Sequence, residues 1–157
     1  MSQPSATTNG LDGPWLISNA VRQITMGIFS QIFGGDRSDG QFRSAMQHLS
    51  NRVDQSERNS GRIQVLRNSG VSERDRRSLK VYFITNSREK AKALIVELSA
   101  LGHRCEWSPP SGRDNEFIVS GVTCDLSMND EQIMKWTDEM CDLAAGLDCE
   151  FVHWTLQ

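Results

Sequence analysis

GHRCEW at residues 102–107 and GLDCEF at residues 146–151 are two versions of one short pattern. Each holds a glycine, two further residues, a cysteine, a glutamate and an aromatic residue, and each follows a stretch with apolar residues at helical spacing. Internal similarity of this kind indicates that one structural unit is used twice. The two copies therefore place the main structural unit of the chain at residues 79–156.

Four strands and two helices are predicted around the two copies. Residues 79–85, 116–126 and 149–156 are rich in β-branched and aromatic residues, as strands are, and 103–107 is a short strand between them. Apolar residues recur every three or four positions after Asn86 and again after Asn129, which indicates amphipathic helices. Each Asn precedes a Glu or Gln by three residues, as a capping box requires. The order βαββαβ predicts an α+β, ferredoxin-like domain: a four-stranded antiparallel sheet with two helices on one face.

The repeated pattern also predicts which side chains reach the open face of that sheet. The first and third strands should be central, so the second and fourth become edges. Side chains alternate along a strand, so the cysteines and aromatic residues should face the helices while the glutamates face outward. The same alternation places three apolar residues of the last strand beside the second glutamate. We expect either that N-terminal helices cover this row or that it binds a protein; the candidate residues are Glu106, Glu150, Val152, Trp154 and Leu156.

The first 70 residues predict an addition to this domain, which we place at 71–157. Residues 1–13 are small and polar and predict a disordered tail, and 14–70 predict a helical extension with a linker. Within it, 15–33 carry an apolar stripe that favours a helix docked on the domain or on a second subunit. The alternative is an interfacial membrane helix, which the single charge, Arg22, disfavours. Met26 is a second plausible start of translation.

A second helix is predicted just before the domain. Phe42, Met46, Leu49 and Val53 form its apolar stripe, at steps of four, three and four. The polar run 55–61 can break this helix, and 61–68 then reads as a short helical turn.

Several kinds of chemistry are not expected. No phosphate loop, nucleophile elbow or comparable catalytic motif is present in the sequence, so we predict a non-enzymatic protein without a cofactor. His103, Cys105, Cys149 and His153 have the composition of a metal site. The predicted sheet, however, separates the two cysteines by three strand spacings, roughly 14 Å, which excludes a shared ion or a disulfide.

The charge is divided unevenly along the chain. Residues 1–80 hold eleven Lys and Arg against seven Asp and Glu, whereas residues 81–157 hold six against thirteen. An acidic folded half repels phosphates, so direct binding of nucleic acid is not expected. The sequence has no 18-residue apolar run and no signal-peptide pattern at its start, so we expect a cytoplasmic protein.

Residues 63–156 resemble the regulator of ribonuclease E activity B (RraB-like) family. The resemblance rests on the turn NSG at 68–70, the helix end LSALGH at 98–103 and the last strand, CEFVHW at 149–154. The family's last strand typically has Glu, an aromatic residue, Asp-Gly and Trp; Glu150, Phe151 and Trp154 match, while Val152 and His153 replace the Asp-Gly. The long acidic tail associated with that regulator is absent from this sequence.

This resemblance implies a small cytoplasmic protein that binds a ribonuclease E-type endoribonuclease and inhibits it without chemistry of its own. It assigns no individual binding residue. The alternative hypothesis is a small-ligand-sensing, ACT-like domain, which shares the βαββαβ order and commonly dimerises. An acylphosphatase-type enzyme is disfavoured because 85–88, after the first strand, lack a glycine cradle for phosphate.

Overall fold

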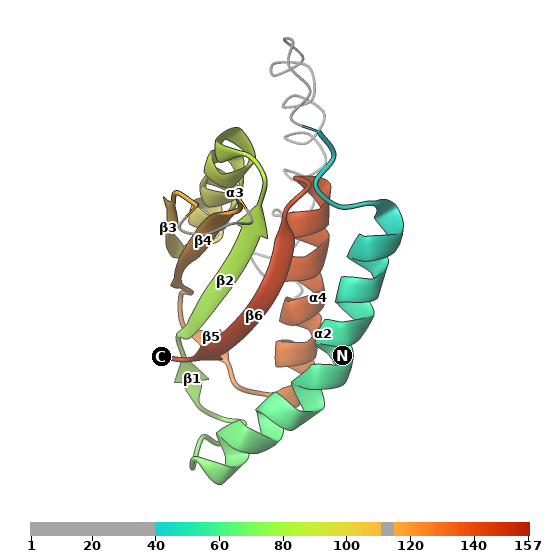
Figure 1. Ribbon diagram of the computed structural model, residues 1–157. Coiled ribbons are helices and arrows are strands. Elements are labelled where there is room, and N and C mark those ends of the chain that lie inside the picture. The colour runs from blue at the N-terminus through green and yellow to red at the C-terminus, as the bar shows by residue number, and fades with distance from the viewer. Residues whose placement is uncertain (1–39, 111–114) are drawn as a thin grey trace, which may run out of the picture. The chain divides into compact units, whose positions relative to one another are not determined.

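Four antiparallel strands in the order β3-β4-β2-β6 form the main sheet (Figure 1). The computed structural model describes residues 40–110 and 115–157, all within one compact unit, Ser38–Gln157. The tail predicted at 1–13 and the helix predicted at 15–33 lie outside the described residues. The elements are α2 (Ala45–Asn68), β1 (Arg76–Arg77), β2 (Leu79–Thr85), α3 (Arg88–Ala100), β3 (Arg104–Ser108), β4 (Phe117–Val122), β5 (Leu126–Ser127), α4 (Asp130–Gly146) and β6 (Glu150–Leu156).

The predicted α+β, ferredoxin-like arrangement is confirmed. β2 and β4, the first and third strands of the βαββαβ unit, are central, and β3 and β6 are the edges. α3 and α4 lie behind the sheet in the view of Figure 1, and no described helix covers the face toward the viewer, which we call the open face. The predicted third strand is divided in two, because β5 leaves the main sheet and pairs with β1.

The core lies between the sheet and the helices. Along β2, Leu79, Val81 and Phe83 are fully buried and alternate with more exposed residues, as expected for a strand with one covered face. Phe151 of β6 packs against Phe83, with ring centroids 4.9 Å apart, and meets Trp136 of α4 edge-on at 6.0 Å. Packing of these aromatic rings joins β2, β6 and α4 into one core.

α3 and α4 end in turns of the same type. Each has one residue in the left-handed region just beyond its C-cap: Gly102, with φ of 81°, and Asp148, with φ of 50°. The next residue donates its backbone N–H back to the helix, His103 to the Leu98 carbonyl at 3.0 Å and Cys149 to the Ala144 carbonyl at 2.8 Å. These are Schellman-type ends. Gly102 therefore corresponds in structure to Asp148, two residues away from the sequence match.

α2 corrects the prediction for residues 42–68. It is one helix of 24 residues, so the polar run does not break it, and Ser44 caps it through a capping box with Gln47. Its buried residues are Gln55, Asn59, Ile63 and Leu66. The predicted apolar stripe points the other way, since Met46, Leu49 and Val53 are 73%, 57% and 49% exposed.

Candidate protein-interaction surface

The open face of the sheet is defined by the strand register. Cross-strand partners share a face in an antiparallel sheet, so Tyr82 lies with Ser120 on one side and with His153 on the other. Glu106 in turn pairs with Ser120. The same register gives the full face: Lys80, Tyr82, Ile84, Arg104, Glu106, Ser108, Ile118, Ser120, Val122, Glu150, His153 and Thr155.

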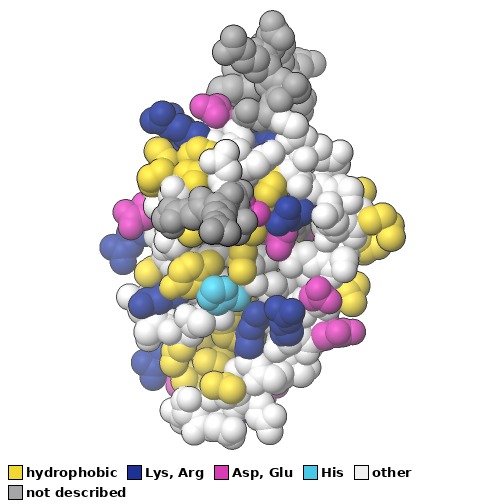
Figure 2. All heavy atoms as spheres, in the orientation of Figure 1, with side chains coloured by type: hydrophobic (Ala, Val, Ile, Leu, Met, Phe, Trp, Pro, Cys, Tyr) yellow, Lys and Arg dark blue, Asp and Glu magenta, His cyan; other side chains and the backbone are white. Residues whose placement is uncertain are grey.

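An aromatic pair occupies the middle of this face. The rings of Tyr82 and His153 are stacked, with centroids 4.5 Å and planes 16° apart. Ile84, Ile118 and Val122 surround the pair and are partly exposed. In Figure 2, hydrophobic side chains gather over this side of the molecule between scattered basic and acidic groups. Apolar surface around aromatic residues with a polar rim is typical of protein interfaces.

Burial lowers the pKa of His153, and the nearby positive charge of Arg62 lowers it further. Both effects favour the neutral imidazole at physiological pH. The centre of the open face therefore carries a neutral stacked pair rather than a charge, which suits an apolar contact.

A β-bulge changes the predicted positions in the last strand. The register of β2 with β6 shifts between Tyr82 and Phe83, which pair with His153 and Phe151, so Val152 is the extra residue. One inserted residue reverses the alternation beyond it. His153 consequently faces outward and Trp154 faces inward, beside Val81.

The placement of Trp154 and Leu156 on the open face was therefore wrong. Trp154 is 2% exposed, meets Trp136 edge-on with ring centroids 6.4 Å apart, and donates its indole N–H to Asn59 of α2 at 3.0 Å. Leu156 pairs with Leu79 on the helix side, at the strand's exposed end. The alternative expectation, that N-terminal helices cover this row on the open face, is correct only in that α2 contacts Trp154, because the contact lies on the helix side of the sheet.

The two glutamates do lie on the open face, in different surroundings. Glu106 is exposed and makes no ion pair or hydrogen bond among residues 40–110 and 115–157. Glu150 forms an ion pair with Arg43, which also reaches Glu116 at 3.4 Å. Glu150 is therefore engaged within the molecule, and Glu106 is available.

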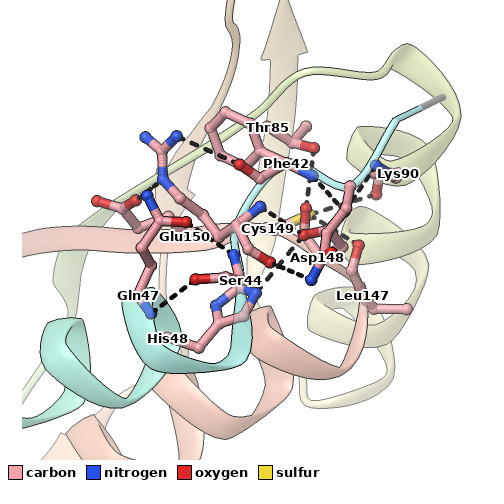
Figure 3. A network of polar contacts seen from close by, with 12 residues as sticks. Phe42, Ser44, Gln47, His48, Thr85, Lys90, Leu147, Asp148, Cys149 and Glu150 are labelled. Carbon is pink, nitrogen blue, oxygen red and sulfur yellow. Dashed lines mark hydrogen bonds and ion pairs between the residues drawn. The ribbon is translucent and has the colours of Figure 1, made fainter.

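Asp148 is the centre of a polar clasp that also contains Phe42, Arg43, Lys90 and Glu150 (Figure 3). Its carboxylate accepts hydrogen bonds from the backbone N–H groups of Phe42 and Arg43 at 2.7 and 2.9 Å, and from Lys90 at 2.8 Å. Burial alone would raise the pKa of Asp148, but these donors outweigh burial and lower it. The clasp fixes the start of α2 against the turn before β6.

Side-chain amides of α2 cover the outer edge of β6. Gln55, 1% exposed, donates to the carbonyls of Phe151 and Val152 at 3.2 and 2.6 Å, and Asn51 donates to Phe151 at 3.0 Å. An edge strand presents unpaired backbone groups, and amides are able to satisfy them where apolar side chains are not. This explains why a polar stripe of α2 is its buried one.

The thiols are placed for packing. Cys105 and Cys149 lie on the two opposite edge strands, or next to them, as predicted. Burial raises the pKa of Cys105 to about 11, and raises that of Cys141 and Cys149 to about 12, so these thiols stay protonated and poorly nucleophilic. Within the described part of the chain, no group of three or more His, Cys, Asp or Glu side chains is arranged to hold a metal ion.

Sequence reasoning missed the Tyr82–His153 pair and the clasp. Tyr82 had a usable signal, because residues 80, 82 and 84 are the outward positions of a strand whose odd positions are apolar. His153 had none, since only the bulge turns it outward. The clasp joins residues more than 100 positions apart and leaves no local pattern.

No helix in the described ranges is long and apolar enough to cross a membrane. No curated protein matches the chain. The profile of the family described as "Regulator of ribonuclease activity B" matches residues 56–155, which span the second half of α2 and the whole sheet with its helices. The chain belongs to the RraB family of regulators of ribonuclease activity.

Proposed function

We propose that this chain regulates an endoribonuclease of the ribonuclease E type in the cytoplasm by binding it as a protein, through the open face of the sheet. The observation that carries this proposal is the stacked Tyr82–His153 pair in a partly exposed apolar surround, within the matched domain. Aromatic residues at the centre of a patch are the usual anchors of protein interfaces.

The side chains elsewhere in the domain that are capable of nucleophilic or acid–base chemistry support binding rather than catalysis. The thiols with strongly raised pKa values are protonated at neutral pH, and His103 is neutral and buried, with its Nδ1 accepting from the Cys124 backbone N–H. A regulator of this kind acts by occupying a surface of the enzyme, and needs no reactive group of its own.

The test combines binding and activity measurements with single substitutions. Titration calorimetry of the full chain against a ribonuclease E-type enzyme should give a saturable complex, and the same enzyme should cleave RNA more slowly in its presence. Tyr82→Ala should weaken binding at least ~10-fold, because it removes the central aromatic contact. Val65→Ala on α2, which truncates another exposed apolar residue, should change the affinity by less than ~2-fold.

Two results would count against the proposal in different ways. If the wild-type chain binds and Tyr82→Ala, shown by circular dichroism to be folded, binds equally well, the enzyme does not use the open face. If the wild-type chain neither binds nor slows the ribonuclease, the enzyme itself is the wrong partner.

A further inference from the structure

β3 is an edge strand of the main sheet. It pairs with β4, and among residues 40–110 and 115–157 no other segment bonds to its backbone. The opposite edge, β6, is covered by Gln55 and Asn51. An open row of N–H and C=O groups is a template for pairing with another strand.

Two uncommitted charges of opposite sign lie along this edge. Arg104 and Glu106 are exposed, point to the same face of the sheet, and form no ion pair or hydrogen bond with any other described residue. Between them Cys105 faces the helix side, opposite Gly121. The order along the strand is therefore positive, apolar, negative, which is complementary to its own reverse.

We propose that β3 pairs antiparallel with β3 of a second copy of this chain, around a two-fold axis at Cys105. For the helices of both copies to lie on the same side of the joined sheet, the two-fold axis must be perpendicular to the sheet. Because side chains alternate along a strand, such an axis passes through a residue position and not between two residues. An axis at Glu106 sets two glutamates opposite each other, and an axis at Arg104 sets two arginines opposite each other. Only the axis at Cys105 brings Arg104 of each copy opposite Glu106 of the other, which is the favourable cross-strand pair.

The paired copies would form a continuous eight-stranded sheet. The pairing gives the outer backbone groups of β3 the partners that α2 supplies to β6. Both open faces remain accessible on the same side, so the proposal is independent of whether a ribonuclease is bound.

The test uses the full chain alone, by analytical ultracentrifugation across a range of concentrations. The wild type should be in equilibrium between monomer and dimer. Arg104→Glu and Glu106→Arg each place like charges opposite each other twice, and each should raise the dimer Kd at least ~10-fold. Controls of the same charge change away from β3, Lys80→Glu on β2 and Glu131→Arg on α4, should dimerise as the wild type does.

The double variant R104E/E106R gives the most specific result, because only the axis at Cys105 sets its glutamate opposite the arginine of the other copy, so it should recover the homodimer. Mixing the two single variants tests charge pairing between copies. One chain then carries glutamate at both positions and the other arginine at both, so their mixture should form a heterodimer more tightly than either forms a homodimer. A wild type that stays monomeric at all concentrations, single variants that dimerise normally, or a mixture that stays monomeric would each overturn the proposal.

Discussion

The two halves of the sequence repeat fold alike and are used differently. α3 and α4 end in the same turn, with Gly102 and Asp148 in equivalent left-handed positions, and each turn leads into an edge strand. At β3, the turn has a glycine in place of the aspartate, and no described segment covers the edge. At β6, Asp148 holds the chain before α2, and amides of α2 cover the edge. The repeat determines the fold. Residues 42–55, some 100 positions before β6, give the second half contacts that the first half lacks.

The largest difference should appear at the two tryptophans of the edge strands. Trp154 on β6 is 2% exposed and enclosed by Trp136 and Asn59, so Trp154→Ala should lower the free energy of unfolding by about 3–5 kcal/mol. Trp107 on β3 is half-buried, with Arg88 over its ring at 5.0 Å. Trp107→Ala should cost about 1–2 kcal/mol, within the usual range for single substitutions. Urea denaturation of both variants measures the difference.

Equal losses for the two variants would mean that coverage by α2 adds nothing to the second half. A conservative control, Trp154→Phe, keeps most of the apolar volume but loses the hydrogen bond to Asn59. It should lie between the wild type and the alanine variant, because the Asn59 carbonyl oxygen is left without that donor.

The same contrast shows how far the sequence could be interpreted. The offset of two between the sequence match and the structural match of the halves did not disturb the prediction for Glu106 and Glu150, because an even shift preserves the face of a strand. The bulge at Val152 is an odd shift, and it reversed the prediction for Trp154. No residue in that strand marks a bulge by itself, so alternation alone could not locate it.

α2 was misjudged for a related reason. Its apolar residues Met46, Leu49 and Val53 are at helical spacing, and periodicity assigns such a stripe to the core. The stripe that is buried contains Gln55 and Asn59, because it meets strand carbonyls and an indole N–H. Hydrophobic periodicity carries no information about partners that are backbone groups of a distant strand. The order of strands and helices needed only local patterns, so it could be predicted.

The two halves should also differ in how pH affects their stability, because the first residue after each turn is a histidine in one half and a cysteine in the other. His103 follows Gly102 and is 4% exposed; burial lowers its pKa from 6.5 to about 4. Between these values the unfolded chain binds a proton that the folded chain does not. The stability due to neutral His103 is complete above pH 6.5 and is lost as the pH falls to about 4. At about 1.4 kcal/mol per pKa unit, the loss amounts to about 3 kcal/mol. Cys149, its counterpart, does not titrate in this range.

His103→Asn is the matched control, since its side-chain oxygen is able to accept the Cys124 N–H and has no proton to gain. The free energy of unfolding of this variant should fall less steeply than that of the wild type between pH 6.5 and 4. Parallel curves for the two proteins would show that His103 takes up its proton at the same pH in the folded as in the unfolded chain, and hence that burial does not lower its pKa.

The smallest of these effects should come from the turn residues themselves. Asp148→Gly keeps a residue that accepts the left-handed conformation but removes the acceptor for Phe42, Arg43 and Lys90. The three bonds are only partly buried, so water replaces them in the variant, and we expect their joint loss to cost about 3 kcal/mol, the upper end for one hydrogen bond to a charged group. Relief of the left-handed backbone returns about 1 kcal/mol, so a net loss of about 2 kcal/mol is expected in thermal or urea unfolding.

The reverse change, Gly102→Asp, measures the effect of the left-handed backbone on stability without the contacts of the clasp. Gly102→Asp places a carboxylate where an added Cβ meets only the Cβ of Cys124, at 3.7 Å, so it should cost no more than about 1 kcal/mol for the left-handed backbone.

The contribution of Asp148 to stability should depend on pH. Its pKa is lowered in the folded chain, so the contribution is present above the unfolded pKa of 3.8 and is lost as the pH falls through the folded value. Asp148→Gly should therefore differ most from the wild type near neutral pH and least in strong acid. A penalty that is equal at both pH values would assign the loss to the turn geometry, and the second half would then owe its contacts with residues 42–43 to something other than this carboxylate.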